Sequence, residues 1–363
     1  MVEGCMRGIV ILCLLLMGAD TVWGMVSGPC SNCHTMHNSQ NGSAVDSDGP
    51  SSHLLTTSCV GCHSHATDTI VVVGETRIPI VFTHSKPTYP ATGSPTSTLA
   101  GGNFFWVSQE GGDAYGHNVY GISGQDNDLA TAPGTSLGAS GGGAGGCADC
   151  HATLASSNPV SGCTGCHVPK HHADDCQEIV DGAGGWYRFL GENVAMVGDS
   201  GTYGVTGIED ENWEQNPSSN QHNTYMGTTE PYVKSVNSYM RTESIGQFCA
   251  GCHGNFHHAM NEESTDLSGA WIRHPSDVVL PVDGEYQYYK TYNPLVPVAK
   301  TSLTGQKNSA TVTPGSDVVT CISCHRPHGS PYPDMLRWDY SEMVAGGGGN
   351  SSGCFVCHSS KDD

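Results

Sequence analysis

The sequence predicts a protein that is mostly coil, with few short helices and one β-hairpin, and its composition and pattern support this fold class. Glycine accounts for 48 of the 363 residues. Only 13% of the residues are charged, about half the usual fraction. Long apolar segments with helical or strand periodicity are few. A chain of this length could bury a large core. Because so few apolar periodic segments are present, something other than packed helices and sheets has to supply much of that interior.

The motif C-x-x-C-H occurs seven times along the chain. Two thiols three positions apart can each bond one vinyl group of a porphyrin, and the next imidazole is then held beneath the iron. This is the pattern of covalent c-type haem attachment. Paired cysteines also form zinc sites, but zinc gives no reason for a His directly after every second Cys. We therefore expect seven haem c groups with their iron, attached through Cys30 and Cys33, Cys59 and Cys62, Cys147 and Cys150, Cys163 and Cys166, Cys249 and Cys252, Cys321 and Cys324, and Cys354 and Cys357.

The same motifs supply the proximal iron ligands, which are His34, His63, His151, His167, His253, His325 and His358. With the first 24 residues removed, about 48 residues remain for each haem, so every haem must lie near another. We expect the chain to wrap around a row of stacked haems, which would provide much of its core.

Secondary structure between the motifs is sparse. Segments 69–73 and 78–82 flank Gly74-Glu75-Thr76-Arg77 and predict a β-hairpin, with Pro79 restricting the second strand to a sheet edge. Short helices are expected at 242–253 and 333–343. Residues 134–146 are rich in Gly and Ser and predict a flexible connector.

The motif spacing suggests five regions. The first is a secretory signal peptide over residues 1–24, whose apolar run of twelve residues is too short for a transmembrane anchor. The others are an N-terminal dihaem region with the hairpin (25–133), the connector with a second dihaem region (134–185), a single-haem region (186–300) and a C-terminal dihaem region (301–363). No later segment is apolar enough to span a membrane, so the mature chain is expected to have no span.

The chain has 19 His residues, and twelve remain after the proximal ligands are assigned. Seven are needed if every iron has two His ligands. The candidates for the second, distal position are His37, His84, His117, His172, His222, His257, His274 and His328. His171 is the alternative to His172, and His53 and His65 are weaker candidates. Met ligation would raise the potential, but the surplus of His argues against it.

Two candidates follow a motif by three residues: His37 after His34, and His328 after His325. On a helical turn such imidazoles leave the same face as neighbours. Because trans ligands approach iron from opposite sides of the ring, each is expected to serve a haem other than the one attached beside it. His257 follows His253 by four and is similar.

The formal charge is −21, which favours solubility, and no basic stripe for nucleic acid occurs. Of 17 Cys residues, 14 lie in the motifs and two lie in the signal peptide. The remaining Cys176 is either a free thiol or half of an intermolecular disulfide.

Several segments resemble outer-surface multihaem c-type cytochromes with doubled CXXCH motifs. They are 30–42 (CSNCHTMHNSQNG), 99–108 (LAGGNFFWVS), 249–258 (CAGCHGNFHH), 271–277 (WIRHPSD) and 321–340 (CISCHRPHGSPYPDMLRWDY). Some relatives of this type, from metal-reducing bacteria, polymerise into filaments with a continuous row of haems. The resemblance implies a fold with little secondary structure and a role in extracellular electron transfer, at the cell surface or beyond it.

The expected function is electron transfer through seven bis-histidine haems by a secreted protein that is not an enzyme. Expected partners are other copies of itself in a filament, redox partner cytochromes and extracellular electron acceptors. The alternatives are a monomeric periplasmic shuttle and a multihaem reductase with an open haem position. A reductase needs an exchangeable ligand position, whereas all seven motifs end in His.

The motif count makes a stoichiometric prediction. The intact mass of the mature protein should exceed the polypeptide mass by seven haems, and acid-acetone extraction should not remove them, because thioether bonds hold them. A haem-free protein that carries zinc would contradict the interpretation.

Overall fold

The computed structural model describes residues 26, 28–129, 132–133, 154–157, 161–172, 177–182, 185–191, 203–230, 242–253, 256, 274–348 and 351–361. The signal peptide, the Gly-rich connector, the third motif with its His151, and the candidates His257 and Cys176 lie outside these residues. The proposed region boundaries stay a prediction.

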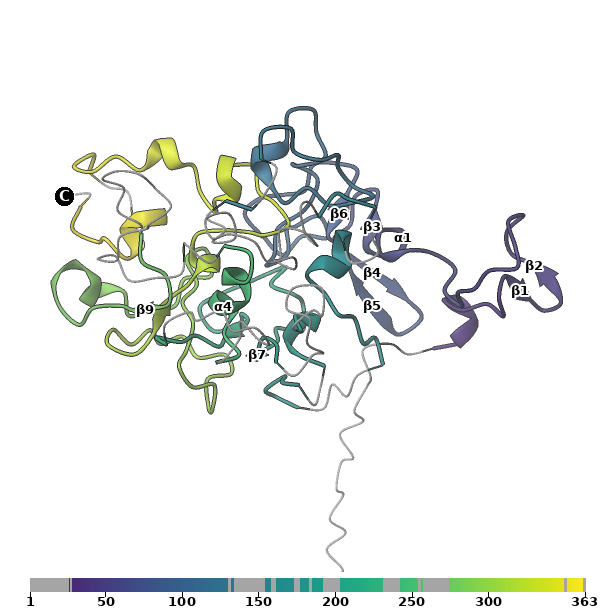
Figure 1. The fold of residues 1–363 in the computed structure, drawn as a ribbon. Helices are drawn as coiled ribbons and strands as arrows, with labels where there is room; N and C mark the ends of the chain where they lie inside the picture. The colour runs from purple at the N-terminus through teal and green to yellow at the C-terminus, as the bar shows by residue number, and fades with distance from the viewer. Residues whose placement is uncertain are drawn as a thin grey trace, which may run out of the picture.

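The described chain is mostly coil, as predicted (Figure 1). Its helices are only a turn or two long: η1 (Cys30–Asn32), α1 (Cys59–His63), η2 (Asp113–Tyr115), η3 (Gly162–Gly165), η4 (Tyr187–Phe189), α4 (Ile245–Ala250), η6 (Gly284–Tyr288), η7 (Cys321–Ser323), η8 (Pro333–Met335), η9 (Tyr340–Glu342) and η10 (Gly353–Val356). No helix in this part of the chain is long and apolar enough to cross a membrane.

The strands form small two-stranded sheets. They are β1 (Ser39–Gln40), β2 (Ser43–Ala44), β3 (Ser64–His65), β4 (Ile70–Val73), β5 (Thr76–Pro79), β6 (Phe82–Thr83), β7 (Gly207–Ile208), β8 (Thr224–Tyr225), β9 (Val278–Val279) and β10 (Val318–Val319). The pairs β1–β2, β4–β5, β7–β8 and β9–β10 are antiparallel, and β3–β6 is parallel. Each sheet joins short pieces of coil and none forms a layer.

The predicted hairpin is present as β4 and β5, with Val73 opposite Thr76 and Ile70 opposite Pro79. The turn is two residues long and begins at Gly74, whose φ of +64° favours glycine there. The second strand therefore starts two residues earlier than expected. It ends at Pro79 because proline offers no N–H to extend the ladder.

The helix expected at 242–253 forms as the shorter α4, whose first turn is capped by the Ser244 side chain accepting from the Gln247 amide. The single helix expected at 333–343 is wrong. Two 3₁₀ turns, η8 and η9, occupy that stretch, because Asp334 and Met335 have positive φ and Leu336 is extended.

In the part of the chain that the structure describes, buried apolar side chains form three small clusters. One surrounds Val205 and Val318, one surrounds Leu280 and Val298, and one contains Phe104. Each is bordered by a motif cysteine: Cys166 and Cys252 in the first, Cys357 in the second and Cys163 in the third. The apolar interior is thus broken up around the motifs, as expected for a chain built around large apolar groups.

Hydrogen bonds between distant segments join the N-terminal and C-terminal regions. The buried Arg326 guanidinium donates to the carbonyl oxygen of Leu99 at 2.7 Å. Tyr89 donates from its hydroxyl to the carbonyl oxygen of Arg337, also at 2.7 Å. The segments 89–99 and 326–337 are therefore packed together near the sixth motif.

A buried ion pair holds the segment around β10. Lys300 donates to the carboxylate of Asp317 and to the carbonyl oxygen of Thr311. The same carboxylate accepts from the Thr313 amide at 2.9 Å. Both charged side chains are about 5% exposed or less, so loss of one would leave the other buried and uncompensated.

Substitution Lys300→Met should therefore lower the free energy of unfolding by about 3–5 kcal/mol, the usual cost of breaking a buried pair from one side. Urea denaturation followed by far-UV circular dichroism measures this. The exposed Lys307→Met is the matched control and should change stability by less than about 0.5 kcal/mol. Equal effects of the two changes would contradict the role given to the pair.

Candidate haem-binding sites

Each described motif forms a tight helical turn. In five of them the amide of the motif His donates to the carbonyl oxygen of the first Cys, at 2.8–3.1 Å. The second motif is the short helix α1 itself. Because residues i, i+3 and i+4 share one face of a helical turn, both thiols and the imidazole leave the backbone on the same side. A porphyrin bound through the two sulfurs would have the imidazole next to its centre.

The described motif cysteines are all free thiols and form no disulfide. Among the described residues, no three His, Cys, Asp or Glu side chains gather as a metal cage. The donor set therefore fits haem attachment better than zinc ribbons, which need four convergent ligands.

Five motif His residues each face a second imidazole from a distant segment. The ring centroids are 6.1–6.3 Å apart in every pair. The pairs are His34 with His172, His63 with His171, His167 with His328, His253 with His117, and His358 with His274.

This separation matches two imidazoles on opposite sides of one metal ion. With a metal–nitrogen bond of about 2 Å and roughly 1.15 Å from the nitrogen to the ring centre, two imidazoles on opposite sides of a metal ion would have their ring centres about 6.3 Å apart. Rings in direct stacking contact would lie closer, as His222 and Tyr292 do at 3.5 Å. The residues present therefore fit a bis-histidine iron at five motifs.

Four of the expected distal candidates lie in these pairs: His117, His172, His274 and His328. His328 faces His167 and not the adjacent His325, as the same-face argument predicts. Their ligation of iron stays a prediction, and the facing geometry supports it.

The sequence offers His171 only as an alternative to His172, whereas in the structure each of the two lies opposite a different motif His. His171 faces His63, and His172 faces His34. The signal in the sequence is the doublet itself, since two adjacent imidazoles can serve two neighbouring haems when their side chains diverge.

Backbone carbonyls orient most of these imidazoles. The Nδ1 atom donates to a carbonyl oxygen at 2.7–3.1 Å, which leaves Nε2 free to bind metal. The donor and acceptor pairs are His63 with Pro79, His117 with Pro327, His167 with Arg188, His253 with Pro133, His274 with Pro275 and His325 with Asp334. His358 differs, because its Nδ1 donates to the carboxylate of Glu285 at 3.0 Å.

Burial keeps many of these rings neutral. Together with the smaller effect of neighbouring imidazoles, it lowers the pKa of His117 to about 4 and that of His328 to about 3. The pKa values of His167, His171, His253, His274 and His325 are lowered by the same desolvation. Neutral imidazole is the form that binds metal.

His222 is placed differently from the expectation. Its Nδ1 contacts the carbonyl oxygen of Asn223 at 2.7 Å, and its Nε2 contacts that of Ser309 at 3.1 Å. The ring is buried and stacks on Tyr292. With both nitrogens occupied, this imidazole packs inside the protein and has no nitrogen left for iron.

The other candidates have no facing imidazole among the described residues. His84 is exposed and lies edge-on to Phe82. His65 accepts the Asp68 amide at Nδ1, which makes Nε2 the protonated nitrogen and not a ligand. His37 is exposed on the N-terminal arm, and the proximal His325 likewise has no facing ring in the described part of the chain.

The six described motifs follow one another in space as a row. Cys33 raises the pKa of Cys62, after the larger effect of burial, and Cys59 is hydrogen-bonded to Cys163. Cys249 is hydrogen-bonded to Cys321, and Cys166 also raises the pKa of Cys249. After the larger effect of burial, Cys357 and Cys354 raise the pKa of Cys324. In a haem-loaded chain these sulfurs would be thioethers that no longer titrate, so the relevant fact is their proximity, which gives the order first, second, fourth, fifth, sixth and seventh motif.

Comparison with known proteins finds a matching family model, a similar sequence and a similar fold. The family described as "Doubled CXXCH motif" matches residues 314–363. The chain is 28% identical to C-type cytochrome OmcS of Geobacter sulfurreducens, over 93% of this chain and 86% of that protein. Its fold is similar to that of the Outer Membrane Cytochrome S Filament from Geobacter sulfurreducens, with a TM-score of 0.50 and 21% identity over 87% of this chain and 85% of that one.

The facing pairs predict which iron each distal His serves. His328→Ala should leave the haem count unchanged but remove the sixth ligand from the iron attached beside His167. EPR of the oxidised protein should then show about one high-spin ferric haem that the unsubstituted protein lacks.

His222→Gln is the matched control, since it removes a buried His that faces no other imidazole. It should leave all haems low-spin. The pairing is wrong if His222→Gln produces the high-spin signal or His328→Ala does not.

Proposed function

We propose that this chain is a multihaem c-type cytochrome with paired CXXCH motifs, that it transfers electrons outside the cytoplasm through a row of bound haems, and that its copies assemble into a filament. The five imidazole pairs at 6.1–6.3 Å carry this proposal. A bound haem iron supplies a reversible one-electron couple. With both axial positions filled by His, an iron has no free position for a substrate, which favours electron transfer over catalysis.

The protein's own residues set the row. Described cysteines of the first, second, fourth, fifth, sixth and seventh motifs lie beside those of the next motif in this order, and desolvation lowers the pKa of several of the paired imidazoles. Seven haems remain the expected number, with the third motif outside the described residues. The order of the motifs supports a path that runs from the N-terminal arm to the C-terminus.

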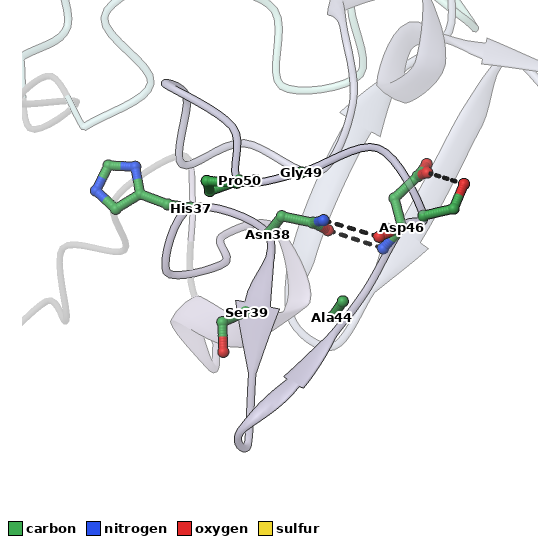
Figure 2. A pocket seen from close by; sticks show the side chains of 8 residues that line it. His37, Asn38, Ser39, Ala44, Asp46, Gly49 and Pro50 are labelled. Atoms are coloured by element: carbon green, nitrogen blue, oxygen red, sulfur yellow. Dashed lines mark hydrogen bonds between the residues drawn. The ribbon is translucent and has the colours of Figure 1, made fainter.

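The N-terminal arm carries His37 away from the body of the molecule. Residues around β1 and β2 project to one side in Figure 1, and the C-terminus lies on the opposite side. His37 lies at the edge of a hollow of about 260 Å³ in this arm (Figure 2). Two reciprocal hydrogen bonds between Asn38 and Asp46, at 2.8 and 2.7 Å, fix the loop.

The His37 ring is oriented for ligation outside its own chain. Its Nδ1 contacts the carbonyl oxygen of Ser51 at 2.9 Å, which leaves Nε2 exposed. Figure 2 shows the ring pointing away from the residues around it. We assign it as the distal ligand opposite His325 of a neighbouring copy, because neither ring faces another His among the described residues.

Apolar side chains are exposed at both ends of the row. The arm exposes Met36, Val45, Leu54 and Leu55 by 42–66%. The C-terminal part exposes Val282, Tyr288, Tyr340 and Val344 by 58–70%. A contact between unlike ends of two copies is heterologous, and unless its rotation closes a ring it generates an open filament. The similar solved structure is that of a filament, which supports this assembly.

Two alternatives differ from this proposal in what becomes of the iron beside His325. In a reductase that position would stay open to a substrate. In a monomeric shuttle a His of the same chain would fill it, and the expected ligand His257 lies outside the described residues. The unsubstituted protein is expected to be wholly low-spin and filamentous, which neither alternative combines.

Secretion by the signal peptide would place the protein outside the cytoplasm, on the cell surface or beyond it, with the periplasm as the alternative. Redox partner cytochromes and extracellular acceptors remain the proposed partners. Self-repulsion from a net charge of −21 should make assembly depend on salt.

The assembly can be tested by substituting His37. Negative-stain microscopy at moderate salt should show thin filaments of fixed axial repeat for the unsubstituted protein. His37→Ala should abolish the filaments and add about one high-spin haem to the EPR spectrum, because the iron at the joint loses its ligand.

His53→Ala is the matched control, since His53 is also an exposed imidazole of the arm. It should leave filaments and spectrum unchanged. A monomer that stays monodisperse on concentration, with every haem low-spin, would favour the shuttle.

A further inference from the structure

The imidazole of the last motif has a hydrogen-bond partner of a different kind from the others. His358 Nδ1 lies 3.0 Å from Glu285 Oε1, whereas the six carbonyl-bonded rings described above donate to neutral backbone oxygens. Two of these, His325 and His253, are proximal ligands of the neighbouring motifs. Among the described motif His residues, only His358, at the C-terminal end of the row, bonds to a carboxylate.

The carboxylate is held in place from several directions. Ser360 donates its hydroxyl to Glu285 Oε2 at 3.1 Å, and Ser359 donates to the Glu285 carbonyl oxygen at 2.6 Å. Lys361 Nζ is 4.0 Å from Oε2. The Glu285 side chain is only 10% exposed. The side chain of Glu285, at the start of η6, is therefore held in a fixed position beside His358 and is not a mobile surface side chain.

We propose that Glu285 is a positioning residue that makes the haem of the seventh motif the lowest-potential site of the C-terminal pair. The inference rests on the proposed attachment of haem at Cys354 and Cys357. It concerns the reduction potential of that haem, and it gives the proposed electron path a direction at its C-terminal end.

The reason is electrostatic. A ligand imidazole that donates its Nδ1 proton to a carboxylate becomes a stronger electron donor than one that donates to a carbonyl. Hydrogen bonds to an ionised acceptor are also roughly twice as strong as neutral ones. More electron density on His358 stabilises the ferric state of the iron that it binds, and the reduction potential falls.

His325 provides an internal comparison. Its Nδ1 donates at 2.8 Å to the backbone oxygen of an acidic residue, Asp334, whose carboxylate is exposed and is not the acceptor. The sixth and seventh motifs thus each have an acidic residue at the proximal His, but only the seventh uses the carboxylate. An electron at the seventh site would move to the sixth, toward the interior of the row.

The experiment is a spectroelectrochemical titration of the haem-loaded protein and its variants. Glu285→Gln keeps the shape and removes the charge. One component of the titration should rise by the equivalent of about tenfold in the ferric-to-ferrous equilibrium, which is 59 mV for a one-electron couple. Glu285→Asp should restore much of the original value.

Asp334→Asn is the matched control, because it removes a nearby acidic charge without touching the backbone acceptor of His325. It should shift the titration by much less. Ser360→Ala leaves the Glu285 carboxylate with one fewer donor, so His358 should bond to it more strongly and the same component should fall. This variant keeps the test decisive if Glu285→Gln does not mature.

The proposal is overturned if Glu285→Gln shifts no component more than Asp334→Asn does, or if Ser360→Ala raises the potential. Haem count by mass and the low-spin EPR signal are measured on the same samples. Failure of this inference would leave both unchanged, whereas failure of the proposed electron-transfer function would show in the haem count or the spin state.

Discussion

The spacing between two facing imidazoles is the constraint on which this structure depends. A metal ion between two His rings fixes their centres about 6.3 Å apart, and five pairs lie within 0.2 Å of that value. To satisfy it, the chain must bring these five CXXCH turns to His residues from distant segments. The single-turn helices and two-residue strands are the connections that this requirement allows.

The same constraint explains why the interior is fragmented. Apolar clusters form beside Cys163, Cys166, Cys252 and Cys357, where a porphyrin would supply the missing apolar surface. Polar groups follow the same logic. Most of the motif and facing His rings donate from Nδ1 to backbone carbonyl oxygens. These oxygens are available because few of them are used in helix or sheet hydrogen bonds.

Local chemistry could be predicted from the sequence, and tertiary placement could not. The motifs, the β4–β5 hairpin and the sparse secondary structure follow from spacing, turn residues and composition. The same-face argument gives His328 a haem other than the one attached beside it, and in the structure His328 faces His167.

His222 looks equally suitable in the sequence, but its burial against Tyr292 and its contact with Ser309 depend on residues 70 to 87 positions away, which no local pattern encodes. The role of His171 could not be predicted because a doublet does not show how two side chains diverge. The helix expected at 333–343 fails at two residues with positive φ, which hydrophobic periodicity does not report.

The imidazole pairs also enclose loops that overlap along the sequence. The loop from 63 to 171 lies inside the loop from 34 to 172, those from 117 to 253 and from 167 to 328 cross, and the loop from 274 to 358 crosses the last of these. With an iron bound between the rings, each pair would act as a reversible cross-link that limits the freedom of the unfolded chain, as a disulfide does. Because the loops interlock, opening one pair loosens the segment that closes the next, so the chain should unfold cooperatively although it has no large core. Maturation should be slow as a result, because surplus His residues compete for every iron, and wrong pairs must dissociate before the right ones form.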